Sequence, residues 1–194
     1  LILRPTLRRL PGVTANPMDL VISGGIVADG TGAPPFPADV GIDNGIVEAI
    51  GDLSGTDADR RMDASGLVVS PGFIDVHSHS DFTLLVDPRA QSQIAQGVTT
   101  EVIGNCGHGC APISDPNLFT ANIYGYTDDR QIDWHSTTEY LDRLEQVRLA
   151  VNVATLVPCG NLRIAQVKDN GRAATNEELA AMDADLREGL EAGA

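Results

Sequence analysis

From Pro71 onward, short apolar runs alternate with segments of helical periodicity, and this alternation constrains the fold more than any other feature of the chain. The runs are GFIDV (72–76), VTTEVIG (98–104) and VNVATLV (151–157). They are short and rich in residues that suit buried strands. A helical pattern follows each run, and three strand–helix units in series predict parallel strands joined by right-handed crossovers. The sequence therefore predicts an α/β fold.

Cap signals mark the ends of the predicted helices. Asp87-Pro88 has the form of an N-cap and a first helical residue, and Gly97 has the form of a stop, so a helix is predicted over 88–96. The capping-box spacing Ser/Thr-x-x-Glu occurs at 136–139 and again at 175–178. It predicts two further helices, one after each box.

Residues 18–70 follow a different pattern. Asp43-Asn44-Gly45 lies between two apolar runs and is a strong hairpin signal, and Gly24-Gly25 is predicted to be a turn between two further strands. These features indicate a small all-β unit. The preceding residues 1–17 carry three arginines and no acidic residue, and we expect them to be disordered or to lie upstream of a true start at Met18.

The three strand–helix units are compatible with two architectures. The sheet either stops as a small open sheet or continues into an eight-stranded barrel, which typically needs about 250 residues and has its active site at the C-terminal strand ends. Because Ala194 comes directly after a predicted helix stop, we expect the N-terminal part of a truncated TIM-type (β/α)8 barrel. The expected domains are an unmatched leader (1–17), a small β portion (18–70) and the first three β/α units (71–194).

Two histidines separated by one serine follow the first predicted barrel strand. Side chains alternate along a strand, so His77 and His79 are expected on one face, about 6.6 Å apart, with Ser78 facing the other way. Two imidazoles at this spacing can bind one metal ion, and imidazole nitrogen suits zinc. The alternative is a hydrogen-bonded core histidine beside a solvated one. On the metal interpretation, replacement of Ser78 by alanine should be nearly silent.

A cysteine follows the second predicted strand. Cys106 is expected at the same sheet edge as the two histidines, and Gly104 and Gly107 beside it allow close approach of the backbone. A thiolate at this position can bind or bridge metal. We therefore assign His77, His79 and Cys106 as candidate metal ligands.

The other candidate groups are given structural or solvent-exposed roles. Cys110 is expected to pack as a small apolar residue, and His108 and His135 are expected to be solvated within a long polar connection over 107–135. Such long connections are usually functional lids or insertions. Cys159 could line the mouth of the barrel, and the only lysine of the chain, Lys168, falls in a predicted loop.

Charge and composition limit the classes of partner. The net charge of −14 argues against nucleic acid and anionic membranes, because both require basic surface. No apolar run approaches the roughly 20 residues of a membrane-spanning helix, and no signal-peptide core is present. An odd number of cysteines, three, does not form a disulfide framework. We expect a cytoplasmic protein with a small-molecule partner, and the sequence leaves the oligomeric state open.

Several longer motifs resemble one known family. DLVISGGIVADGTG, ASGLVVSPGFIDVHSHSD and QGVTTEVIGNCGHGCAP, with the spaced series DW, EYLDRLE, VNVATLV and GNLR, are similar to the N-terminal part of the N-acyl-D-amino-acid deacylases. These deacylases, or D-aminoacylases, belong to the metal-dependent amidohydrolase superfamily. The resemblance covers residues 19–194. Two positions depart from the common pattern, His108 and Cys159, and both bear on substrate fit more than on metal binding.

The resemblance implies a fold, a site and a reaction. The fold would be a zinc-containing barrel with a small β-sandwich domain, and one or two zinc ions would be held by His77, His79 and Cys106, the last in the place of a carboxylated lysine. Two more histidine ligands and the general-base aspartate would follow Ala194, so no catalytic or substrate-binding residue is assigned here. The implied reaction hydrolyses N-acyl-D-amino acids to a carboxylate and a free D-amino acid, and the fragment alone would be inactive.

Two other classes stay open at this point. A cyclic-amide hydrolase of the dihydroorotase or hydantoinase kind shares the His-x-His motif but bridges its metals with a lysine on a later strand. The non-enzyme alternative is an inactive structural or interaction unit.

Overall fold

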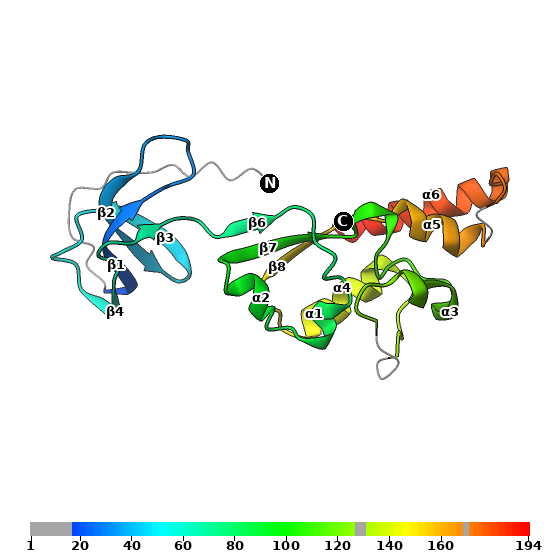
Figure 1. Cartoon of the computed structure of the whole chain (residues 1–194), viewed down its shortest axis with the longest axis horizontal. Helices are drawn as coiled ribbons and strands as arrows, with labels where there is room; N and C mark the ends of the chain where they lie inside the picture. The colour runs from blue at the N-terminus through cyan, green and yellow to red at the C-terminus, as the bar shows by residue number, and fades with distance from the viewer. Residues whose placement is uncertain (1–16, 127–130, 169–170) are drawn as a thin grey trace. The chain divides into compact units, whose positions relative to one another are not determined.

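The computed structural model describes residues 17–126, 131–168 and 171–194. The chain divides into two compact units, residues 1–71 and 72–194, which are described separately (Figure 1). The predicted leader lies outside the described residues except for Pro17. Within the described ranges, no helix has the length and apolar character needed to cross a membrane.

The first unit contains one five-stranded sheet. Its path runs β3-β2-β1-β4, with β5 also paired to β1. The β1–β2 and β2–β3 pairs are antiparallel, and β4 and β5 run parallel to β1. The strands are β1 (Met18–Val27), β2 (Phe36–Asp43), β3 (Ile46–Gly51), β4 (Ala58–Asp63) and β5 (Val68–Val69).

The predicted hairpin is confirmed, whereas the predicted Gly24-Gly25 turn is wrong. Asn44 and Gly45 join β2 to β3 with φ values of 50° and 75°, which is the combination of positive values that a tight I′ hairpin turn requires. Strand β1 instead continues through both glycines, with a register shift between Ile22 and Gly25. Because β1 is paired on both sides, its neighbours keep it extended and the glycines produce a bulge in place of a reversal.

The second unit is built on a parallel sheet, as predicted. Its order is β6-β7-β8, and both pairings are parallel. The strands are β6 (Phe73–Asp75), β7 (Val98–Ile103) and β8 (Asn152–Thr155). Figure 1 shows them side by side with helices α1, α2 and α4 along one side. The α/β class is therefore confirmed, although β6 is shorter than the predicted strand over 72–76.

Six helices and two 3₁₀ turns are described in this unit. Both predicted capping boxes are present, at the starts of α4 and α6. The elements are α1 (Thr83–Val86), α2 (Gln91–Ile94), α3 (Pro116–Phe119), α4 (Thr137–Gln146), α5 (Cys159–Gln166) and α6 (Asn176–Glu191), with η1 (Asn105–Gly107) and η2 (Thr120–Asn122).

The helix predicted over 88–96 is wrong in its extent. Asp87 ends α1, since its backbone N–H donates to the carbonyl of Thr83, and its carboxylate is bound by Arg89 at 2.7 Å. Ala90 then has a left-handed φ of 44°, so α2 begins only at Gln91. Asp87 therefore lies at the end of α1 and does not begin the next helix.

Helix α5 was not predicted. It contains Gly160 and Asn161, which have low helix propensity. The Asn161 side chain is buried and joins the helix to the preceding connection, with its Nδ2 donating to the carbonyls of Gly109 and Pro112 at 2.8 and 3.2 Å. Tertiary hydrogen bonds of this kind, which the local sequence does not reveal, accompany the helix.

Helices α4 and α6 are joined by one carboxylate. The Glu188 side chain on α6 accepts hydrogen bonds from the backbone N–H groups of Thr137 and Thr138 at 3.1 and 2.9 Å, and from the Thr138 hydroxyl. These donors lie in the first turn of α4, whose N–H groups lack intrahelical partners. Burial acts to raise the pKa of Glu188, but the hydrogen bonds outweigh it and the pKa is lowered.

We expect Glu188→Ala to lower the free energy of unfolding by about 1 kcal/mol, because it removes a cap from α4. The lowered pKa means that this stabilisation is complete above the ordinary carboxyl pKa of 4.5 and is lost as the pH falls through the folded-state value. Urea titrations of the full-length protein at several pH values measure it. Glu191→Ala, which removes the same charge from an exposed position on α6, is the control.

Candidate metal centre

The C-terminal ends of β6 and β7 lie at one edge of the parallel sheet. The two strands pair with Asp75 opposite Glu101. His77 and His79 follow the end of β6, and Cys106 follows the end of β7 within η1. Parallel strands place such segments at the same edge, so the sheet itself brings the three predicted ligands into one region.

The three side chains form a cluster of possible metal donors. One donor atom from each of His77, His79 and Cys106 lies within 4.8 Å of the others. His77 Nε2 and Cys106 Sγ are 3.2 Å apart, and the two imidazole centroids are 5.5 Å apart. Zinc binds nitrogen and sulfur at about 2.0–2.3 Å, which separates tetrahedral donors by roughly 3.5 Å. The separation of His77 Nε2 from Cys106 Sγ is close to this value, and all three donors lie near enough to one another to approach a single ion.

The chemistry of the donor set also fits zinc. The Nδ1 atom of His79 is buried and has no hydrogen-bond partner among the described residues. A buried polar atom without a partner typically costs about 1–3 kcal/mol, and metal coordination is one way to satisfy imidazole nitrogen. Two imidazoles and one thiolate are ligand types that zinc prefers.

The backbone around Cys106 adopts an uncommon conformation that brings it close to the neighbouring strand end. Gly104, Cys106 and Gly107 have φ values of 80°, 56° and 78°, in the left-handed region that favours glycine. A Cβ atom on Gly104 would lie 2.5 Å from the carbonyl oxygen of Leu156. Only glycine fits at residue 104, and this close contact fixes the segment that carries the thiol.

Asp81 connects the histidine segment to the cysteine segment. Its Oδ1 accepts the Gly104 backbone N–H at 2.9 Å, and its backbone carbonyl accepts the Tyr140 hydroxyl at 2.7 Å. Burial raises the pKa of Asp81 to about 6, although the Gly104 hydrogen bond opposes this, and the nearby Glu101 adds to the increase. The carboxyl group thus ties η1 to the chain just beyond His79.

The two imidazoles lie together as predicted, with ring centroids 5.5 Å apart, but the strand that was expected to carry them ends before they begin. Strand β6 ends at Asp75, and residues 76–79 lie beyond it, with a bend at 76–77 and no regular structure at 78–79, so the face alternation of a strand does not apply to them. Ser78 is only 6% exposed, and its hydroxyl donates to Glu101 Oε2 at 2.5 Å. This contact is a reason to expect that Ser78→Ala is not silent, because the substitution would leave the buried Glu101 carboxyl group without its donor.

The remaining sequence assignments have mixed outcomes. Cys110 is 1% exposed, as predicted, and burial raises its thiol pKa. His135 is exposed, as predicted, with Nδ1 3.1 Å from the Ile113 carbonyl. The prediction of a solvated His108 is wrong for Nδ1, which is buried without a partner in the described part of the chain. Cys159 and Lys168 are exposed.

Four residues near the site were missed: Asp81, Glu101, Asn105 and Tyr124. An acidic residue inside the apolar run VTTEVIG is the signal that could have identified Glu101. Tyr124 lies in the long connection, and its ring is 4.7 Å from that of His79. No local sequence signal indicates that contact.

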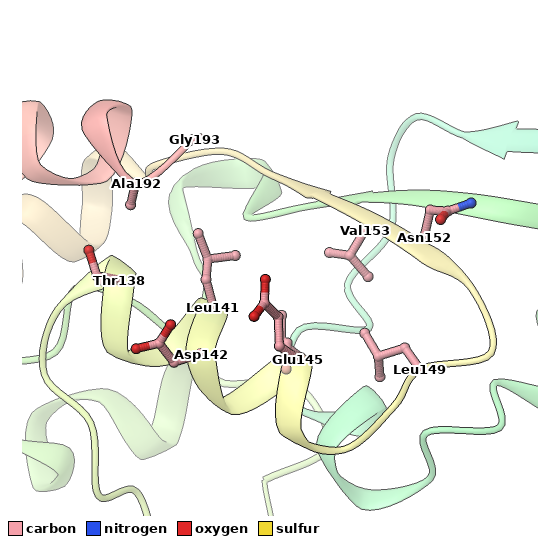
Figure 2. Close-up of a pocket in the computed structure, with 10 residues that line it drawn as sticks. Thr138, Leu141, Asp142, Glu145, Leu149, Asn152, Val153, Ala192 and Gly193 are labelled. Carbon is pink, nitrogen blue, oxygen red and sulfur yellow. The ribbon is translucent and has the colours of Figure 1, made fainter.

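A separate cleft lies between α4, β8 and the end of α6. It has a volume of about 510 Å³ and includes Asp142 and Glu145 among its lining residues. Figure 2 shows Leu141 and Val153 from facing elements pointing toward it. None of its lining residues is a histidine or cysteine, so it is distinct from the donor cluster.

Barrel enzymes have their active sites at the C-terminal strand ends of a parallel sheet, and two histidines and a cysteine are ligand types that zinc binds, so the fold and the cluster are those of a candidate metalloenzyme. Residues 60–194 match the amidohydrolase family. The chain belongs to this family.

Known relatives agree with this assignment. N-acyl-D-glutamate deacylase from Alcaligenes xylosoxydans xylosoxydans is 43% identical over 177 residues, which cover 91% of this chain and 36% of the relative. D-aminoacylase from the same organism is 42% identical over 180 residues, or 93% of this chain and 37% of the relative. This chain therefore spans a little over a third of their length, and its resemblance to the deacylases is confirmed.

Solved structures give the same result. N-acyl-D-glutamate deacylase from Bordetella bronchiseptica, complexed with zinc and a phosphonate inhibitor, has a TM-score of 0.84 and 39% identity. The match covers 91% of this chain and 37% of that one. A D-aminoacylase crystal structure has a TM-score of 0.83 and 40% identity over 92% of this chain and 37% of its own.

We expect Gly104→Ala to cost more stability than an alanine placed at another left-handed glycine. Gly32 has a φ of +85° with no atom within 4 Å of an added Cβ, so Gly32→Ala should cost only the backbone strain, about 1–2 kcal/mol. Gly104→Ala adds a clash with the Leu156 backbone, so it should lower the free energy of unfolding by more than roughly 3 kcal/mol. Urea unfolding of both variants in the full-length protein measures the difference. Equal costs would contradict the close contact.

Proposed function

We propose that the full-length protein hydrolyses the amide bond of N-acyl-D-amino acids, releasing a carboxylate and a free D-amino acid. The observation that carries this proposal is the convergence of His77, His79 and Cys106 within 4.8 Å. The substrate class is supported by the similarity to N-acyl-D-glutamate deacylase and D-aminoacylase. The D configuration comes from those relatives alone.

The site has the residues needed to hold one zinc ion, or to contribute to a pair. When bound, zinc activates water and polarises an amide carbonyl. His77, His79 and Cys106 supply three donors and leave at least one coordination position to other groups. The hydrogen bond from Gly104 to Asp81 holds the cysteine segment against the histidine segment. The general base is expected to be an aspartate C-terminal to these residues, by analogy with the family.

The proposed setting of the site is a complete TIM-type barrel. Strands β6, β7 and β8, with the helices that follow them, supply its first three units over 71–194, and the strands of residues 18–70 supply part of a β-sandwich domain. The proposed substrate is a small molecule, and the proposed location is cytoplasmic.

Cys106 distinguishes this proposal from the cyclic-amide hydrolase alternative. The alternative requires a lysine bridge between metals, whereas here a thiol lies 3.2 Å from His77 Nε2. The third possibility, an inactive structural unit, gives no reason for three donor atoms to meet beside a buried, unpartnered imidazole nitrogen.

Replacement of the candidate ligands should remove zinc and activity together. We expect Cys106→Ala, His77→Ala and His79→Ala in the full-length protein each to lower zinc content and the rate of N-acyl-D-amino acid hydrolysis sharply, because each removes a ligand. Elemental analysis and amide-hydrolysis rates measure both effects.

Cys110→Ala is the matched control for Cys106→Ala. It removes a thiol four residues away that is buried among apolar side chains, and it should cost on the order of 1 kcal/mol of stability without loss of zinc. Wild-type zinc content in Cys106→Ala would exclude the proposed site.

A further inference from the structure

Every polar group of Ser78, the residue between the two histidines, is engaged. Its N–H donates to the Val102 carbonyl at 3.0 Å, and its carbonyl accepts from Asn105 Nδ2 at 3.2 Å. Its hydroxyl donates to Glu101 Oε2 at 2.5 Å and accepts the Ser80 N–H at 3.1 Å. Three of these four partners come from β7 or the turn that follows it. Strand β7 and the turn after it therefore fix the position of Ser78, which lies between the two histidines.

The burial of Glu101 is energetically unfavourable. Its side chain is fully buried on β7, and no ion pair with a basic residue involves it within the described ranges. Its second oxygen, Oε1, has no partner there. A buried carboxylate without a cation destabilises a fold relative to an apolar residue, so its contribution lies in what its other oxygen holds, the Ser78 hydroxyl.

Asn105 links the histidines to the cysteine. Its side-chain Nδ2 donates both to the Val102 carbonyl at 2.8 Å and to the Ser78 carbonyl at 3.2 Å. Asn105 is also the residue directly before Cys106 and is only 8% exposed. One amide group therefore fixes the separation between the segment that carries the imidazoles and the segment that carries the thiol.

We propose that Glu101, Ser78 and Asn105 are positioning residues that hold the three donor atoms in a ligating arrangement. None of the three belongs to the donor cluster itself. The inference rests on the proposed zinc site and deepens it, because it assigns the geometry of that site to a buried hydrogen-bond network that joins β7, η1 and the segment after β6.

Two substitutions of Glu101 separate positioning from other roles. Glu101→Gln keeps an oxygen that accepts from the Ser78 hydroxyl and has nearly the same shape. Glu101→Leu keeps the size and removes the carboxyl acceptor, while the Ser80 hydroxyl stays 2.8 Å from that of Ser78. If Glu101 acts through Ser78, zinc affinity should depend on a hydrogen-bond acceptor at residue 101 and not on its negative charge. Glutamine at this position should then preserve zinc affinity, whereas leucine should lower it. Ser78→Ala removes the donor of the same hydrogen bond and should resemble Glu101→Leu.

The experiment measures zinc affinity of the full-length protein by competition with a chromophoric chelator. We expect Glu101→Gln to bind zinc within about threefold of wild type, and Glu101→Leu and Ser78→Ala to bind roughly 10–100-fold more weakly. The absorption spectrum of the cobalt-substituted protein reports ligand geometry directly. It should be unchanged in Glu101→Gln and altered in the other two variants.

Glu188→Ala is the stability control. It weakens the α4–α6 connection through Thr137 and Thr138 without touching the network, so it should lower the melting temperature and leave zinc affinity and the cobalt spectrum unchanged. Ser78→Ala keeps the test decisive if Glu101→Leu does not fold.

Three results would overturn the inference. Equal loss of zinc in Glu101→Gln and Glu101→Leu would show that the carboxylate charge is required, as for a metal ligand. Unchanged zinc affinity in Glu101→Leu and Ser78→Ala would show that the network does not position the donors. An equal loss of zinc affinity in Glu188→Ala would show that the effect comes from lowered stability alone. Failure of wild type to bind zinc would instead reject the proposed site itself.

Discussion

The parallel pairing of β6 with β7 is the constraint on which the site depends. This pairing places Asp75 opposite Glu101, so both strands end at the same edge and the chain leaves them in the same direction. His77, His79 and Cys106 therefore lie close together, although about 30 residues of sequence separate the two segments. A connection of this kind is needed because parallel strands are joined by a long crossover. An antiparallel pairing would send the two segments to opposite edges of the sheet, and no choice of side chains would then bring the donors together.

Periodic patterns and caps allowed much of the fold to be predicted from the sequence. The Ser136 and Thr175 capping boxes each predicted a helix correctly because their hydrogen bonds are local, with both partners within four residues. The sequence did not indicate α5, whose buried Asn161 bonds to residues about 50 positions away. Long-range partners of this kind have no local signature.

The donor cluster could be predicted from residue type and strand position, but the buried hydrogen bonds around it could not. The two histidines lie beyond the end of β6, in a segment that is hydrogen-bonded to β7, and not on the strand itself as expected. Ser78 is the clearest case: the alternation rule assigned it no role, whereas its hydroxyl bonds to Glu101 in the interior. A rule that applies within a strand fails where the strand ends, which is where the functional side chains of this fold lie.

The connection between α4 and α6 has a consequence for local opening. The amides of Thr137 and Thr138 are bonded to Glu188, 51 and 50 residues further along the chain, so they stay protected from solvent exchange only while α6 remains docked. Fraying of the first turn of α4 must therefore break hydrogen bonds to α6. The local opening of two helices separated in sequence is thereby coupled, and we expect hydrogen–deuterium exchange at these two amides to respond to the docking of a helix to which they do not belong.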